Sequence, residues 1–122
     1  MILRPGNIVF DTQDVARLAR FWAEVTGYEP RPLFGTYAGL RDPSGRGANI
    51  TFQRVEDAEA SSSNCHVDFY AKDPDEVARR AVELGAQLVR RVNEAEVSWI
   101  VLTDPDGNEF CVVSAVGSDR EP

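Results

Sequence analysis

The stretch DPDGNE at residues 104–109 contains a tight-turn signal followed by the start of a strand. In Asp104-Pro105-Asp106-Gly107, proline is preset for the second turn position and glycine is free to take a positive φ. The stretch DPSG at residues 42–45 repeats this signal 62 positions earlier (104 minus 42). We therefore expect each tetrapeptide to link two antiparallel strands as a hairpin.

The two turns belong to a longer internal repeat. A shift of 59 positions (66 minus 7) aligns NIVF at residues 7–10 with HVDF at residues 66–69. The same shift pairs Asp14 with Asp73 and Glu24 with Glu83. Self-similarity at a fixed spacing indicates that one supersecondary unit is used twice.

Each copy reads as one helix and four strands. The alternating runs at 7–11 and 66–70 predict strands. Three further β-prone stretches follow each helix: 29–33, 36–40 and 49–54 in the first copy, and 87–92, 97–103 and 109–115 in the second. The chain is therefore predicted to be α+β, with two tandem βαβββ modules.

Both helices carry local start and stop signals. In the first, Gly27 stands where a left-handed cap belongs, after an apolar stripe of Val15, Leu18, Ala19, Trp22 and Val25. In the second, Asp73 is the expected N-cap, Pro74 suits the first turn, and Glu76 completes a capping box. Its apolar stripe is Val77, Ala78, Ala81 and Leu84, and Gly85 ends it.

The length of 122 residues is enough for one domain and too short for two independent cores. We expect a single domain at 1–116, made of module 1 (6–55) and module 2 (65–115). The segment 56–64 lacks an apolar period and is the expected linker. Residues 117–122 are expected to form a disordered tail.

Charge and composition exclude several partners. The net charge of −7 repels phosphate backbones and anionic lipid, so neither nucleic acid nor a membrane is an expected partner. No leader or membrane-spanning run is apparent, so we expect a cytoplasmic protein. Cys65 and Cys111 are the only cysteines, and reduced thiols are the simplest interpretation.

The paired modules and the closing DPDGNE strand resemble the vicinal-oxygen-chelate superfamily, which includes glyoxalases, bleomycin resistance proteins and extradiol dioxygenases. The likeness covers residues 7–115. RFW at 20–22 and NEFC at 108–111 look most like its glyoxalase-like domain branch. The resemblance implies a curved, cup-shaped mixed sheet with helices on its convex side, and a homodimer.

The resemblance also implies a divalent metal, such as Mn, Fe, Ni, Zn or Mg, held by the first and last strands of each module. The matching positions are Asn7, His66, a residue within 49–51, and Glu109. His66 is the only histidine and is either a ligand or an ordinary strand histidine. Glu109 is expected to bind metal or act as a catalytic base, the alternative being a solvated strand residue.

Asn7 is the third predicted ligand, but it stands where the family has histidine, and residues 49–53 contain no carboxylate or histidine. The predicted metal site is therefore incomplete. The predicted substrate pocket is Asp68, Tyr70, Asn49, Thr51, Trp99 and Cys111. Cys111 is a soft ligand, a nucleophile or a buried apolar residue, and Trp99 either lines the pocket or packs beneath the second helix.

Three functions fit these residues. The first is a metal-dependent lyase, isomerase or dioxygenase acting on a small oxygen-rich substrate. The second is a metal-free protein that binds a small molecule, as bleomycin-binding relatives do. The third is a degenerate module for dimerisation or regulation. Because one scaffold hosts many reactions, the fold does not choose among them.

Overall fold

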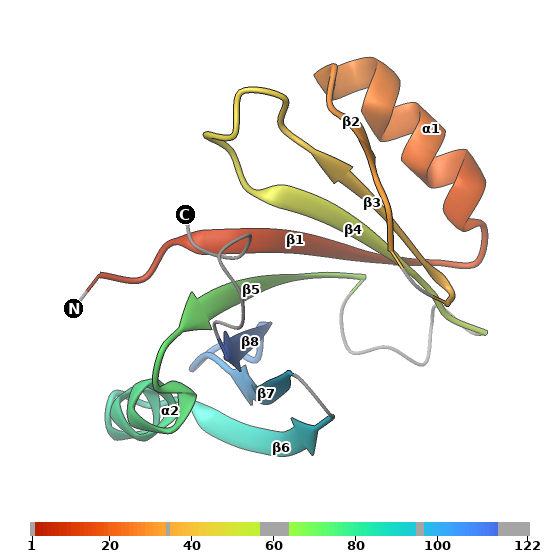
Figure 1. Ribbon diagram of the computed structural model, residues 1–122. Coiled ribbons are helices and arrows are strands. Elements are labelled where there is room, and N and C mark those ends of the chain that lie inside the picture. The colour runs from red at the N-terminus through yellow and green to blue at the C-terminus, as the bar shows by residue number, and fades with distance from the viewer. Residues whose placement is uncertain (1, 34, 57–63, 95–96, 115–122) are drawn as a thin grey trace. The chain divides into compact units, whose positions relative to one another are not determined.

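The computed structural model describes residues 2–33, 35–56, 64–94 and 97–114 (Figure 1). It consists of two compact units, one of residues 7–65 and the other of residues 66–122 together with the first six. The predicted tail at 117–122 and most of the predicted linker lie outside the described residues. Within the described ranges, no helix is long and apolar enough to cross a membrane.

The unit of residues 7–65 carries the first module. Its elements are β1 (Pro5–Thr12), α1 (Val15–Thr26), β2 (Glu29–Arg31), β3 (Tyr37–Arg41) and β4 (Asn49–Arg54). The strands lie in the order β2-β3-β4-β1, with β1 parallel to β4 and the other pairs antiparallel. α1 packs on one face of this mixed sheet (Figure 1).

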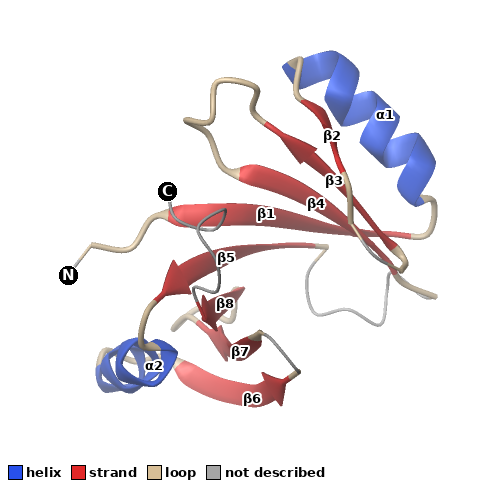
Figure 2. Cartoon of the chain, viewed as in Figure 1, coloured by secondary structure: helices blue, strands red, loops and turns tan. Residues whose placement is uncertain are grey.

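The second unit repeats the arrangement. Its elements are β5 (Cys65–Ala71), α2 (Pro74–Glu83), β6 (Gln87–Asn93), β7 (Ser98–Thr103) and β8 (Glu109–Ser114). The order is β5-β8-β7-β6, again with one parallel pair, β5 with β8. The predicted α+β class and the two βαβββ modules are confirmed, as Figure 2 shows by secondary structure.

Most of the predicted start and stop signals of the two helices are confirmed. The Asp14 carboxylate accepts a hydrogen bond from the Arg17 amide at 3.1 Å, and Asp73 accepts one from the Glu76 amide at 3.2 Å. Gly27 adopts φ 77° and closes α1 as predicted. Because these caps need only local side-chain chemistry, they are visible in sequence.

For two residues of the predicted apolar stripes, the prediction that they face the core is wrong. Val25 is 60% exposed and Leu84 is 66% exposed. Leu84 lies just beyond the last helical residue, as the C-cap of α2. Val25 is in the last turn of α1, where Ala23 packs against the core instead. An apolar period predicts a face, but it does not predict how far the sheet beneath that face extends.

Both Asp-Pro-x-Gly turns are the predicted hairpins, and each is anchored by its aspartate. Asp104 accepts hydrogen bonds from the amides of Asp106 at 2.9 Å and Asn108 at 2.8 Å. The Asn108 side chain also donates to it, and these bonds lower the pKa of Asp104. Asp42 is held in the same way, mainly by Ser44, which lowers its pKa.

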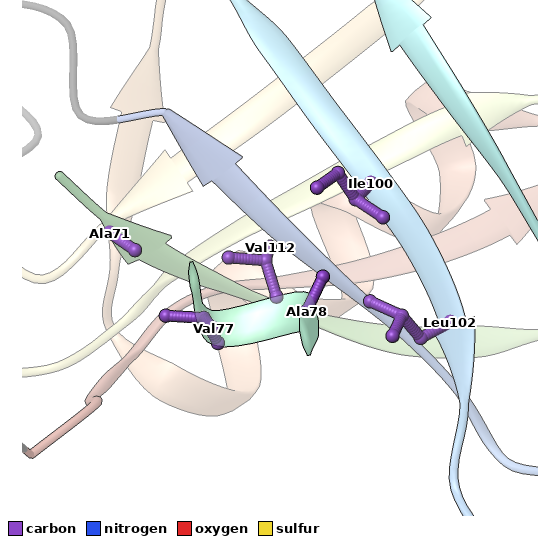
Figure 3. Packing of buried hydrophobic residues seen from close by; sticks show 6 residues of the cluster. All are labelled: Ala71, Val77, Ala78, Ile100, Leu102 and Val112. Atoms are coloured by element: carbon purple, nitrogen blue, oxygen red, sulfur yellow. The ribbon is translucent and has the colours of Figure 1, made fainter. Parts of the chain in front are cut away.

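The core of the second unit lies between α2 and its sheet. Figure 3 shows Val77 and Ala78 of α2 facing Val112 of β8 and Ile100 and Leu102 of β7. Ala78, Leu102 and Val112 are at most 2% exposed. Because strand side chains alternate between faces, the residues next to these in sequence must lie on the opposite face of the sheet.

Candidate functional site

The face of the second unit opposite α2 carries a different set of side chains. Its buried members are Val101, Cys111 and Val113, and Tyr70 and Trp99 pack against them. Since α2 packs on the side of Ile100 and Leu102, Trp99 does not lie beneath the helix. The face is therefore an aromatic and aliphatic wall that surrounds one thiol.

A compact group of donor atoms lies on this face. Each of His66, Asp68 and Cys111 offers one ligand atom, and the three atoms lie within 4.8 Å of one another. His66 Nε2 is 3.4 Å from Asp68 Oδ1, and both side chains are 15% exposed. We call these residues the His-Asp-Cys group.

Two features of the sheet produce the group. His66 and Asp68 are two residues apart on β5 and therefore share a face. The parallel ladder pairs Asp68 with Cys111 on β8, which places the thiol beside the carboxylate. The alternation was visible in sequence, but the pairing joins positions 43 residues apart (111 minus 68) and needed the structure.

Cys111 is a protonated thiol at neutral pH in this environment. Burial is the largest cause that raises its pKa, to about 12, followed by the negative charges of Asp68 and Glu109 and by the hydrogen bond with Asp68. Arg90 acts in the opposite direction. Without an added cation the thiol is therefore a poor nucleophile, because the thiolate is the reactive form.

Glu109 lies next to this group without being one of its three members. It begins β8, pairs with Thr103 across the β7–β8 ladder, and is partly buried. Its charge reaches Cys111, two residues away on the same strand face. Glu109 is thus placed as a second carboxylate at the rim of the group.

The donor set fits a divalent transition metal. Ligands around an ion such as zinc lie about 2.0–2.3 Å from it, which puts neighbouring ligand atoms roughly 3.5 Å apart. The 3.4 Å between imidazole and carboxylate agrees with that spacing. A set of one nitrogen, one oxygen and one sulfur leaves a fourth position for water or substrate, as catalytic sites require.

The predicted residues of the first module form a hydrogen-bonded pair. Thr51 Oγ1 donates to Asn7 Oδ1 at 2.8 Å, and the two residues are 6% and 7% exposed. Asn49 pairs with Asn7 across the β1–β4 ladder. All three lie on the sheet face opposite α1, because Ile50 and Phe52 face the helix.

The two ladders show which positions correspond in the repeat. The pair Val9 and Thr51 on β1 and β4 occupies the place of Asp68 and Cys111 on β5 and β8. Asn7 then corresponds to His66. Apolar and neutral polar side chains in the first module thus stand where the second module has imidazole, carboxylate and thiol.

Gly6 and Arg90 also belong to this site and were not predicted. An added Cβ on Gly6 would lie 2.3 Å from the Tyr70 ring, so the absence of a side chain at this position leaves room for the ring. Arg90 contributes a positive charge near Cys111. Nothing local in the sequence marks either residue, because both act through contacts across strands.

A second, polar depression lies beside α2, lined by Pro74, Asp75, Arg91, Asn93, Ser98, Trp99 and Ile100. Arg91 is paired with Asp75 there. This pairing satisfies the charge of the guanidinium, so the depression offers less to a ligand than the His-Asp-Cys group does.

A family model described as "Glyoxalase-like domain" matches residues 7–113. No curated protein sequence matches the chain. Among solved structures, a glyoxalase/bleomycin resistance protein/dioxygenase superfamily member from Vibrio splendidus has a TM-score of 0.65 at 16% identity. The match covers 93% of this chain and 100% of that one.

Other structures with this fold carry different activities. A Streptomyces coelicolor methylmalonyl-CoA epimerase in complex with 2-nitronate-propionyl-CoA has a TM-score of 0.67 at 14% identity, covering 96% of this chain and 100% of that one. A structure described as an NAD-dependent benzaldehyde dehydrogenase from Legionella pneumophila has a TM-score of 0.70 at 16% identity, covering 90% and 98%. These similarities establish the fold alone.

Proposed function

Because this chain belongs to the glyoxalase-like domain family of the vicinal-oxygen-chelate superfamily, we propose that it is a metal-assisted enzyme acting on a small oxygen-rich molecule. The observation that carries the proposal is the His-Asp-Cys group, whose three donor atoms lie within 4.8 Å. His66 and Asp68 would hold the ion together with Cys111. A bound divalent ion supplies Lewis-acid polarisation of a substrate oxygen.

Proton transfer is the reaction class that these side chains favour. Glu109 lies at the rim of the group and carries a carboxylate, which suits abstraction of a proton next to a carbonyl. Tyr70 and Trp99 pack against the buried residues of the same face and give it an aromatic wall. Among lyase, isomerase and dioxygenase chemistry, we therefore propose a lyase or isomerase.

The direct test follows exchange of substrate protons for deuterium. Metal-loaded protein in heavy water is incubated with α-hydroxy ketones, 2-oxo acids and malonyl-type thioesters, including methylmalonyl-CoA, and the C–H signals are followed by NMR. Glu109→Gln should slow exchange about 10²–10⁴-fold. Glu24→Gln, which changes an exposed glutamate on α1, is the matched control and should leave the rate unchanged.

Two results would count against the proposal that this protein is an enzyme. Metal-loaded protein that exchanges no proton in any of these compounds contradicts the proposed chemistry. A Glu109→Gln variant as fast as the control contradicts the proposed base while leaving the reaction class intact.

A second function, binding of a planar apolar compound, is supported by the wall of Tyr70 and Trp99 beside Val101 and Val113. Fluorescence titration with aromatic ligands tests it. Quenching that persists in metal-free protein and disappears in Trp99→Leu would favour binding over catalysis.

We also propose a cytoplasmic homodimer. Phe21, Leu88 and Val89 are large apolar side chains that are 44–55% exposed, which supports association. Sedimentation equilibrium gives the mass directly, and a monomer at all concentrations would exclude the dimer.

A further inference from the structure

We propose that the His-Asp-Cys group selects a thiophilic transition metal, such as zinc, cobalt or ferrous iron, through direct bonding to Cys111, and rejects magnesium and calcium. This inference rests on the metal-assisted function proposed above and specifies its ion. It is carried by the chemistry of the donors and by their placement in the second unit.

The types of the three donor atoms indicate which class of metal the group would bind. Magnesium and calcium prefer oxygen ligands, and magnesium demands nearly octahedral geometry with several waters retained. Imidazole and thiolate instead favour the later first-row metals, with affinity rising from manganese toward copper and zinc. A group with one nitrogen and one sulfur among its three donors therefore belongs to the second class.

The sulfur of Cys111 is buried and lies close to the other donors. Cys111 is 4% exposed, and its thiol hydrogen bonds to the Asp68 carboxylate. The sulfur is thus already aimed at the other donors of the group. When a sulfur–metal bond forms, the thiol proton leaves to the buffer, so charge and atoms balance with one proton released.

The charges around Cys111 also favour a bound cation. Asp68 and Glu109 place negative charge near the sulfur, while Arg90 is the cation that acts on it. A divalent cation bound beside the sulfur would compensate the charges of these carboxylates. The carboxylates that lie near Cys111 therefore favour a cation bound beside its sulfur.

The two cysteines provide a matched pair for the experiment. Cys65 is exposed, whereas Cys111 is buried. Cys65 also precedes His66 directly in sequence, so it is the alternative sulfur donor that must be excluded. Cys111→Ser therefore removes the sulfur of the group itself, and Cys65→Ser makes the same chemical change outside the group.

The test is cobalt titration of the full chain under reducing, anaerobic conditions, followed by visible and near-ultraviolet absorption. Wild type and Cys65→Ser should both develop a sulfur-to-cobalt charge-transfer band at one equivalent. Cys111→Ser should lose the band and bind cobalt more weakly, by about 100-fold or more, since even residues behind the ligands cost 10- to 100-fold. Zinc should displace the cobalt at one equivalent, and a large excess of magnesium should not.

The outcomes separate this inference from the proposed function. Cobalt bound by wild type without a charge-transfer band, or displaced by magnesium, overturns thiophilic selection and leaves a metal-assisted enzyme standing. A band lost in Cys65→Ser overturns the assignment to Cys111. Wild type that binds none of these metals overturns both proposals. Circular dichroism verifies the fold of Cys111→Ser, and Asp68→Asn, which keeps the sulfur, should retain a weaker band.

Discussion

At the residue scale, the candidate site depends on which atoms are neighbours across the sheet. A buried cysteine usually behaves as a small apolar residue, yet Cys111 lies beside Asp68 and His66. Burial, together with the charges of Asp68 and Glu109, raises the pKa of its thiol to about 12. Gly6 matters because its missing side chain leaves room for the Tyr70 ring.

The pH dependence of stability should report Cys111. Its pKa is raised from 9.0 to about 12 in the folded protein, so its contribution is full below about pH 9 and is lost as the pH rises toward 12. At about 1.4 kcal/mol per pH unit, metal-free protein should lose roughly 3 kcal/mol more than Cys111→Ala by about pH 11. Urea unfolding in a Cys65→Ser background measures this difference, and parallel profiles would contradict it.

Gly6→Ala should destabilise the protein by about 1–3 kcal/mol, because the new methyl group overlaps the Tyr70 ring. Removing the ring should remove the cost. In a Tyr70→Ala background, the same glycine substitution is expected to be nearly neutral in urea denaturation. An equal loss in both backgrounds would show that the ring is not the cause.

At the element scale, each module is built from the same local devices. Asp14 caps α1 and Asp73 caps α2, with bonds of 3.1 and 3.2 Å to an amide three residues on. Asp42 and Asp104 anchor the two hairpins in the same way. Such devices work within a few residues of chain, and they survive in both copies although the site residues differ.

Asp14→Ala and Asp73→Ala should each lower the free energy of unfolding by about 1 kcal/mol, since each removes the acceptor for an amide at a helix start. Asp106→Ala is the control. The described contact of Asp106 is made by its backbone amide, so the change should be within about 0.5 kcal/mol. Chemical denaturation compares the three, and equal effects at all three positions would argue against capping.

At the scale of the whole molecule, the repeat is symmetric in fold and asymmetric in chemistry. The second module carries imidazole, carboxylate and thiol, and the first carries the Thr51–Asn7 hydrogen bond at the corresponding place. One module therefore supplies the reactive donors. The other offers neutral groups suited to hydrogen bonding with an organic ligand.

Zinc should stabilise the whole protein against heat. An ion that binds only the folded state adds about 2.7 kcal/mol at a free concentration 100 times Kd. Thermal melts with and without zinc measure the shift, which a chelator should reverse. His66→Ala is expected to show a much smaller shift, and an unchanged shift in that variant would place the ion elsewhere.

The chain should unfold in one transition, as expected for a single domain of residues 1–116. Units of about 60 residues are marginal alone. The first module illustrates this, since the buried residues of its core cluster are Leu40, Ile50 and Phe52, and α1 contributes no buried residue. Agreement between calorimetric and van't Hoff enthalpies tests the prediction. Two separate transitions would show independent domains.

The sequence by itself determined the class of the fold, the repeat, the helix caps and the hairpins. These follow from spacing and turn chemistry, which act between residues close in the chain. It also determined that His66 and Asp68 share a face of one strand, because alternation has a period of two.

Only the tertiary structure decided that Cys111 joins His66 and Asp68, that Trp99 lies opposite α2, and that Val25 and Leu84 are exposed. Each of these depends on strand register or on where a sheet ends. Contacts between β5 and β8 link residues more than 40 positions apart, and no local pattern specifies which residue of one strand lies beside which residue of the other. The His-Asp-Cys group is therefore a product of strand pairing, whereas the modules that carry it could be predicted from the sequence.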